Sequence, residues 1–194
     1  MAPKAKYTKE MIINSAFELV REQGISALSA RSLAKKMNAS SQPIFTYFNN
    51  MEEVKAEVIK KAKEVYRNDY ILEGLKMNPP FKGVGIKYID FAIKDRMLFE
   101  LLFMSKNDET SHYLPSFDDN AKDVEKVLVE SYHLSLEDSK ELYNLLSIFV
   151  HGIATLFARE SYILTEEDAS NMLTTVFMAL TKYMKEGRVN EYYN

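Results

Sequence analysis

The chain has 194 residues, of which 46% are hydrophobic and 27% charged, and it contains no cysteine. This is the composition of a globular protein large enough to bury a core, and it excludes disulfide bonds and thiolate metal sites. The net charge is −3, but residues 1–50 carry seven Lys or Arg against three Glu, a charge of +4, which leaves −7 for residues 51–194. A basic front indicates that only this part meets a polyanion, although chance scatter of surface charge gives the same count. The first ten residues lack the apolar run of a secretory signal, so we expect a cytoplasmic protein.

Two amphipathic helices are predicted first. Thr8 is suited to cap a helix over 8–23, because apolar residues then recur at the i, i+3 and i+4 positions of one helix face. Gly24 ends this helix in the manner of a C′ glycine. Ser29 provides the cap of a second, shorter helix at about 29–36.

A third and a fourth helix follow a tight turn. The turn lies at Asn38-Ala39, since Asn tolerates a left-handed backbone. Ser40 is expected to cap the third helix, and Pro43 falls in its first turn, where the missing N–H costs nothing. The stretch Asn50-Met-Glu-Glu53 resembles a capping box that begins a longer helix, running to about residue 75.

Two short helices joined by a tight turn and supported by a longer one form a helix-turn-helix. The second helix of such a pair presents its N-terminal residues to the major groove of DNA. A three-helix bundle without DNA-binding function has the same periodicity, so periodicity and charge favour the helix-turn-helix without proving it.

Asn78-Pro79-Pro80 breaks the chain and marks the expected domain boundary. We therefore predict an all-α protein with a helix-turn-helix domain at 1–50, a connecting helix at 50–75 and a larger helical domain at 76–194. The most apolar stretch, about Leu142 to Ala158, is too short and too interrupted to span a bilayer, and it is read as a buried helix. The further helices are expected at about 80–94, 95–105, 116–132, 136–160 and 166–186, with the clearest loop from Asp108 to Pro115.

The first quarter of the chain resembles the DNA-binding domain of the TetR family of bacterial transcriptional regulators. The later two thirds resemble, less closely, the variable ligand-binding and dimerisation domain of that family. The residues that carry the likeness are Thr8, Ile12, Ala16-Phe17 and Leu19, Arg-Glu-Gln-Gly at 21–24, Leu28-Ser29, Leu33-Ala34, Ala39-Ser40, Phe45-Thr46-Tyr47-Phe48 and Glu52-Glu53-Val54, and further along Met97 to Phe103 and His151 to Leu156.

The resemblance implies which residues meet DNA. Those at the start of the second helix would meet phosphates, those at the start of the third would face base edges, and the rest would reach the backbone. Tyr47 is read equally well as a core aromatic whose hydroxyl lies at the surface, and Arg31 as a partner of a nearby Glu. The implied DNA-binding residues are Ser29, Ala30, Arg31, Lys36, Ser40, Ser41, Gln42, Pro43, Thr46, Tyr47 and Lys55.

The chain departs from the family pattern at three positions. It has Gln42 where the family usually has Gly, Phe45 where it has Tyr, and Met51 where it has Lys. The Tyr hydroxyl and the Lys ammonium commonly contact phosphates, so their loss predicts weaker DNA binding, or rescue by other residues, namely Thr46, Tyr47, Lys36, Lys55 and the Lys4/Lys6 arm. Gln42 can pair with both N6 and N7 of adenine, or can merely cap or solvate the first turn.

The second domain is expected to bind an apolar or aromatic small molecule. Its segments are rich in aromatic residues and Met, which adapt to varied ligands but are more often simply core. His151 is read as a hydrogen-bonded core residue rather than a ligand contact, and the three His lack metal-ligand spacing, so no metal or cofactor is expected. The candidate ligand-binding residues are Tyr88, Phe91, Met97, Phe99, Phe103, Met104, Tyr143, Phe149, His151 and Phe157.

The resemblance further implies a homodimer formed through the last two helices, which reads a pseudo-palindromic operator as a repressor and is released by the ligand. Catalytic motifs such as a glycine-rich phosphate loop do not occur in the sequence, so an enzyme is not expected. The remaining alternative is a ligand-sensing or interaction protein of the same fold whose DNA binding is weak or lost.

Overall fold

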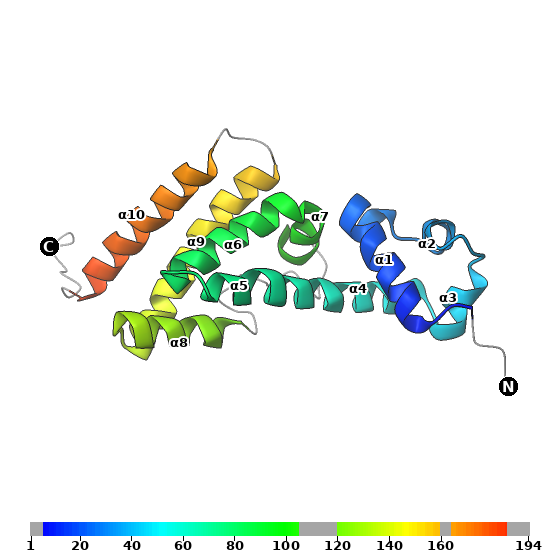
Figure 1. Ribbon diagram of the computed structural model, residues 1–194, viewed down its shortest axis with the longest axis horizontal. Helices are drawn as coiled ribbons and strands as arrows, with labels where there is room; N and C mark the ends of the chain where they lie inside the picture. Colours follow the sequence, from blue (N-terminus) through cyan, green and yellow to red (C-terminus); the bar gives the residue numbers. More distant parts are fainter. Residues whose placement is uncertain (1–5, 105–119, 160–163, 186–194) are drawn as a thin grey trace, which may run out of the picture. The chain divides into compact units, whose positions relative to one another are not determined.

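The computed structural model describes residues 6–104, 120–159 and 164–185, and these divide into two compact units. The first, here called the head, comprises residues 6–66 and 95–104. The second, here called the body, comprises residues 67–94, 120–159 and 164–185. Within these ranges all regular structure is helical, which confirms the predicted all-α class (Figure 1).

The head begins with α1 (Lys9–Gln23), which ends at Gly24 as predicted. The Thr8 hydroxyl accepts a hydrogen bond from the backbone N–H of Met11 at 3.2 Å and so caps the first turn. Gly24 has a φ of 81°, a left-handed conformation that glycine adopts without strain. A 3₁₀ turn, η1 (Ile25–Ala27), leads to α2 (Ala30–Lys36), whose N-cap is Ser29 as expected.

The third helix, α3 (Gln42–Tyr47), begins later than its expected cap at Ser40. The prediction that Ser40 caps this helix is wrong, because the N-cap is Ser41, and that residue makes no side-chain capping bond. A Ser40 cap would place Pro43 at the third helical position, where it has no N–H to donate to the cap side chain. The preceding turn is as predicted, with Asn38 left-handed at a φ of 51°.

The connecting helix is interrupted. α4 (Met51–Val65) is capped by Asn50, whose side chain accepts the Glu53 N–H at 3.0 Å. The Glu53 carboxylate accepts two bonds from Asn49, and these hydrogen bonds lower the pKa of Glu53. Instead of one helix to about residue 75, the chain passes through a π-helical turn, η2 (Tyr66–Ile71), before α5 (Leu72–Leu75).

The head is completed by a segment that is distant in sequence. α7 (Arg96–Phe99) packs on α1, and the π-helical turn η3 (Glu100–Met104) packs on α4. Leu98, Phe99 and Leu101 are fully buried there. The predicted helix at 95–105 therefore exists as α7 and η3, but it belongs to the head rather than to the predicted second domain.

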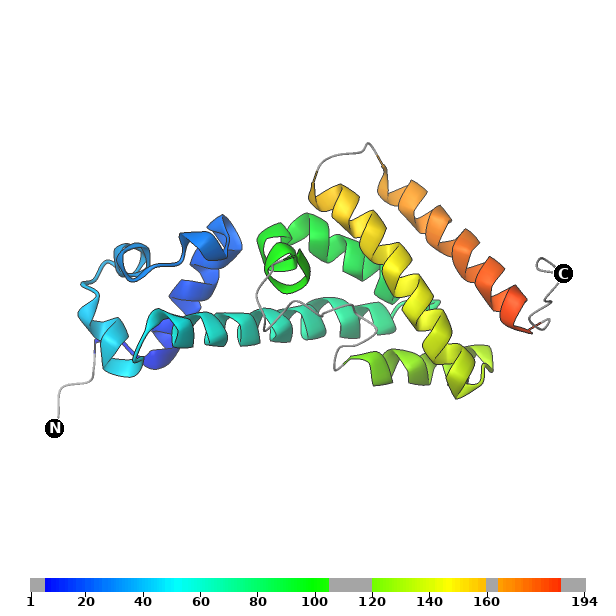
Figure 2. The same ribbon diagram turned by 180° about the vertical axis from the view of Figure 1, so that it is seen from behind.

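The body is built on α6 (Pro80–Lys94), which packs against α5, α9 and α10. α9 (Leu136–Ala158) and α10 (Glu166–Lys185) run side by side, and α8 (Ala121–Tyr132) packs on α9 (Figures 1 and 2). The Ser135 and Thr165 hydroxyls cap α9 and α10 by accepting backbone N–H groups three residues on, each at 3.0 Å. The loop predicted from Asp108 to Pro115 lies outside the described residues.

Among the described residues α9 is the one helix long and apolar enough to cross a membrane. The same composition serves a core helix, and Leu142, Leu146 and Ile153 are buried inside the body. This burial agrees with the sequence reading of the stretch as a buried helix.

The crossing of α5 and α6 depends on two glycines. A Cβ added to Gly83 would lie 2.2 Å from the carbonyl oxygen of Gly74, and one added to Gly74 would lie 2.7 Å from Cα of Val84. Neither distance is compatible with a real side chain, so the two helices approach at backbone contact.

We expect Gly83→Ala to lower the free energy of unfolding by about 1–3 kcal/mol, since backbone cannot yield as a side chain can. Gly85→Ala in the same helix is the control, because its added Cβ would meet side chains rather than backbone, Leu173 at 3.3 Å and Val150 at 3.7 Å. Urea unfolding of both variants measures the difference. Equal stabilities would contradict the assigned helix crossing.

Candidate nucleic-acid interface

The structure places the predicted DNA-binding residues in the head, on α2, the turn that follows it, α3 and the start of α4. Most are exposed, whereas Ala30, Pro43 and Lys55 are half-buried. α2 and α3 are held against α1 by buried Leu33, Ala34 and Ile44, so that the polar residues between them face outward. This arrangement is that of a helix-turn-helix rather than of an arbitrary bundle.

Ser29 stabilises the start of α2. Its hydroxyl accepts the Ser32 N–H at 3.1 Å while its own N–H donates to the Ser32 side chain at 2.9 Å, a complete capping box. The Ser32 hydroxyl in turn donates to the Ala27 carbonyl at 2.6 Å. These bonds fix the start of α2, and so position Ala30 and Arg31 at its first turn.

The cations of the head differ in availability. Lys36 contacts the Glu22 carboxylate at 2.8 Å, and Lys55 contacts Glu52 at 2.7 Å. Arg31, in contrast, is exposed and has no ion pair within the described part of the chain. Of the three predicted phosphate-binding cations, Arg31 is the one whose charge is not already offset by a neighbouring carboxylate.

Gln42 and Thr46 lie one turn apart on α3. The Thr46 hydroxyl donates to the Gln42 carbonyl at 3.1 Å, which is local back-bonding within the helix. The Gln42 side chain is exposed and forms no hydrogen bond with any residue that the structure describes. Its amide is free to meet a base edge, and it is not a helix cap.

The aromatic residues of α3 show what the substitution at position 45 changes. Phe45 is 49% exposed, so an apolar ring stands at the surface where a Tyr would present a hydroxyl. Tyr47 is also exposed, but its hydroxyl donates to the backbone carbonyl of Tyr7 at 2.9 Å. Phe48 is buried and anchors the end of the helix in the core of the head.

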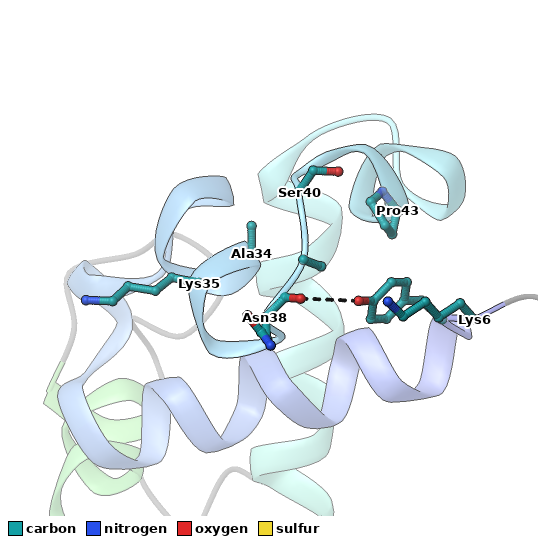
Figure 3. A pocket seen from close by; sticks show the side chains of 8 residues that line it. Lys6, Ala34, Lys35, Asn38, Ser40 and Pro43 are labelled. Carbon is teal, nitrogen blue, oxygen red and sulfur yellow. Dashed lines mark hydrogen bonds between the residues drawn. The ribbon is translucent and has the colours of Figure 1, made fainter.

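A shallow hollow of about 540 Å³ lies beside the turn between α2 and α3 (Figure 3). Ser40 and Pro43 lie along it together with the base of Lys35 and the segment that precedes α1. It contains no acidic side chain. Its lining residues are Lys6, Tyr7, Ala34, Lys35, Asn38, Ala39, Ser40 and Pro43.

Tyr7 and Lys35 were not among the sequence-predicted site residues, and Lys6 was named only as one of the residues that could rescue DNA binding. Lys35 and Lys36 are adjacent and equally basic, but successive residues on a helix point about 100° apart. Only the fold shows that Lys36 faces Glu22 while Lys35 lines the hollow.

Comparison with known proteins agrees with this geometry. Residues 12–58 match the sequence model of the bacterial regulatory proteins of the tetR family. The chain is 24% identical over 177 residues to the uncharacterized HTH-type transcriptional regulator YobS of Bacillus subtilis (strain 168), across 90% of this chain and 91% of that protein. Residues 12–58 thus match a DNA-binding domain of the tetR family. Its fold is also similar to that of a TetR-like transcriptional regulator from Rhodococcus sp. RHA1, with a TM-score of 0.59 and 14% identity over 96% of this chain and 100% of that one.

The match over residues 12–58 and the description of the Bacillus subtilis relative support a TetR-like transcriptional regulator with a DNA-binding head, and such regulators are typically not enzymatic. The helix-turn-helix expected from periodicity and charge is thereby confirmed. The matched residues reach from α1 into α4, so they include α2, α3 and Arg31.

The ten candidate ligand-binding residues do not form one cluster in a single unit. Four of them, Met97, Phe99, Phe103 and Met104, lie in the head, where Phe99 and Phe103 pack at a ring distance of 5.5 Å. The other six lie in the body on α6 and α9: Tyr88, Phe91, Tyr143, Phe149, His151 and Phe157.

His151 forms a hydrogen bond in the body. Its Nδ1 lies 2.9 Å from the hydroxyl of buried Tyr88, which joins α9 to α6. Burial lowers the pKa of His151 below its ordinary value of 6.5. With the imidazole neutral and protonated on Nε2, the Tyr88 hydroxyl donates to Nδ1, as expected for a hydrogen-bonded core histidine.

The lowered pKa predicts a loss of stability in acid. The unfolded chain binds a proton to His151 below about pH 6.5, whereas the folded protein resists it, so the stability that neutral His151 provides falls as pH decreases from that value. His151→Gln should flatten this dependence in urea unfolding between pH 7.5 and pH 5. His133→Asn, at an exposed left-handed position, is the control and should leave it unchanged. An unaltered pH dependence in His151→Gln would contradict the assignment.

Proposed function

We propose that the protein is a homodimeric repressor that binds a pseudo-palindromic operator and is released by a small, largely apolar ligand bound in the C-terminal region. The observation that carries the proposal is the exposed α2–α3 surface of the head. It combines an unpaired guanidinium at Arg31, a free amide at Gln42 and a hollow without acidic residues.

In this proposal one set of residues contacts phosphates and another contacts base edges. Arg31 and the lysines around the hollow contact phosphates, which supplies affinity without sequence information. Ser41, Gln42 and Pro43 open α3 and face base edges, with Gln42 suited to adenine and Pro43 to a thymine methyl group. Thr46, Tyr47, Ser40, Lys36 and Lys55 border the same surface.

Dimerisation is supported by apolar side chains that α9 and α10 leave exposed. Leu145, Ile148 and Leu156 recur on α9 at spacings of three and eight residues around Gly152, whose added Cβ would meet nothing within 4 Å. Met172, Met178 and Tyr183 are exposed on the neighbouring α10. Such side chains on two adjacent helices suit a two-fold interface, which would place two heads about 34–36 Å apart on DNA.

Ligand release is a two-state problem. An effector that binds more tightly to the state in which the two heads do not fit the operator weakens operator binding by the ratio of its affinities for the two states. The operator weakens effector binding by the same ratio. The chain passes between head and body at η2 and at Lys94–Asp95, so both points can transmit a change in the body. The aromatic residues of α6 and α9 are the proposed ligand contacts. An effector with equal affinity for free and DNA-bound dimer would refute this part.

A ligand-sensing protein without effective DNA binding remains the second candidate, favoured by the exposed Phe45 ring and by Met51 in place of a cation. The two functions differ in one measurement. Fluorescence anisotropy with the DNA that flanks the protein's own gene, against a scrambled duplex at several salt concentrations, detects a DNA reader by preferential, salt-sensitive binding. Absence of binding to either duplex at low salt supports the sensor.

Arg31 and Gln42 should affect this binding differently. Arg31→Ala is expected to weaken binding to both duplexes and to reduce the slope of log affinity against log salt by about one for each head. Gln42→Ala should leave the slope unchanged and reduce discrimination by about 1–3 kcal/mol per half-site. Lys36→Ala is the matched control for charge, and its effect should be smaller than that of Arg31→Ala because Glu22 already offsets it. Equal salt slopes in wild type and Arg31→Ala would contradict the assigned phosphate contact.

The dimer is tested by Ile148→Glu. Ile148 is 52% exposed on α9, so the change should be harmless to a monomer, whereas two-fold symmetry would bury one carboxylate from each copy. We expect the dimer to dissociate at least about 100-fold more readily, measured by sedimentation, because an unpaired buried charge costs several kcal/mol. Ile93→Glu, at an exposed position of α6, is the control. A dimer that persists in Ile148→Glu would place the interface elsewhere.

A further inference from the structure

Residues 6–8, the described residues that precede α1, are fastened to the α2–α3 surface of the head. The Tyr47 hydroxyl, at the end of α3, donates to the Tyr7 carbonyl at 2.9 Å. The Tyr7 hydroxyl donates to the Asn38 carbonyl at 3.4 Å, in the turn between α2 and α3 (Figure 3). Two tyrosines thus connect this segment, here called the arm, to both sides of the turn.

The fastening determines where Lys6 lies. Its Nζ is 5.4 Å from the centroid of the Tyr7 ring, and it borders the hollow at the side of Pro43. Lys35 lines the same hollow from α2. Within the described ranges neither lysine has an ion pair, whereas Lys9, Lys36 and Lys55 all do.

The hollow is therefore a basic surface in which no carboxylate competes. The Lys6 ammonium and the Ser40 hydroxyl supply hydrogen-bond donors beside it, whereas the Lys35 ammonium extends away from it (Figure 3), and the lining includes no Asp or Glu to repel an anion. It adjoins Ser40, which precedes α3, and Pro43 in the first turn of α3, the helix that is proposed to read bases. A backbone phosphate of the bound duplex fits this position and chemistry.

We propose that Tyr47 is a positioning residue, which holds the arm so that Lys6 receives a DNA phosphate at this hollow, to which the flexible Lys35 side chain adds its charge when it turns in from α2. The inference rests on the proposed DNA binding. It gives the head a phosphate contact in place of those that are lost with Phe45 and Met51. Tyr47 itself does not contact phosphate in this arrangement. A phenol has one proton, that of Tyr47 is donated to Tyr7, and a phosphate oxygen can only accept.

The fastening is tested first without DNA, by limited trypsin digestion of the full-length protein. Mass spectrometry follows the rate of cleavage after Lys6 in wild type, Tyr47→Phe and Tyr183→Phe. Tyr47→Phe removes one hydrogen bond and should raise that rate about 2- to 10-fold. Tyr183→Phe removes an exposed hydroxyl in the body and should not change it. Equal rates in wild type and Tyr47→Phe would overturn the fastening.

The phosphate contact is tested with a scrambled duplex, whose binding depends on the backbone alone. Lys6→Ala and Lys35→Ala should each reduce the salt slope by about one for each head. Tyr47→Phe should weaken binding in the wild-type background and have little further effect in Lys6→Ala, because it acts through Lys6.

Two other results would count against the proposal. If Tyr47→Phe weakens binding equally with and without Lys6, its hydroxyl acts on DNA directly and the positioning role is wrong. If the wild type binds no duplex at low salt, the proposed DNA binding and the phosphate contact both fail, while the trypsin rates still decide whether Tyr47 fastens the arm. The two failures are thereby distinguished.

Discussion

The head depends on one ion pair, between Arg21 in the last turn of α1 and Asp95 at the start of α7. The guanidinium contacts both carboxylate oxygens, at 2.5 and 3.2 Å, and the Asp95 side chain is only 1% exposed. A carboxylate buried to this degree requires such a partner, since removing one member of a buried pair costs about 3–5 kcal/mol. This free-energy cost is lower here, because the Arg21 side chain is 45% exposed and partly screened by solvent. Arg21 also lies at the C-terminal end of α1, where the helix dipole favours a cation.

The pair makes the head a composite of two distant parts of the sequence. With Asp95 held against α1, the next residues place Leu98, Phe99 and Leu101 in the core of the head. Met97 reaches Gly24, where an added Cβ would lie 3.2 Å from its sulfur. The helix-turn-helix thus rests partly on a segment that immediately follows α6 of the body.

The features that the sequence predicts are those decided by local chemistry. Thr8, Ser29, Asn38 and Asn50 cap or turn the chain through bonds within a few residues, and each has its expected role. The interruption of the connecting helix is different, because Tyr66 begins the π-helical turn while packing edge-on against Phe103, at 5.2 Å between ring centroids. No local pattern encodes a contact across 37 residues.

The same distinction applies to the candidate site. The exposure of Arg31 and Gln42 follows from the helical pattern. Which of Lys35 and Lys36 is free of an ion pair depends on the position of Glu22 in the fold. The hydrogen bond of the Tyr47 hydroxyl likewise depends on the position of Tyr7.

The scarcity of free cations also bears on specificity. If Arg31, Lys6 and Lys35 are the phosphate contacts of each head, a dimer makes six, and its affinity falls about 10³-fold between 50 and 200 mM salt, the lower end for DNA-binding proteins. Few phosphate contacts mean weak binding to unrelated DNA, because that binding is almost entirely ionic. The discrimination that matters in a genome is the ratio of specific to non-specific affinity. A Gln42 contact worth about 1–3 kcal/mol in each half-site therefore contributes a larger share of the total in this head than in one that keeps the Tyr and Lys contacts. On this hypothesis the departures at Phe45 and Met51 would lower affinity for every sequence, and they would leave the choice among sequences to α3.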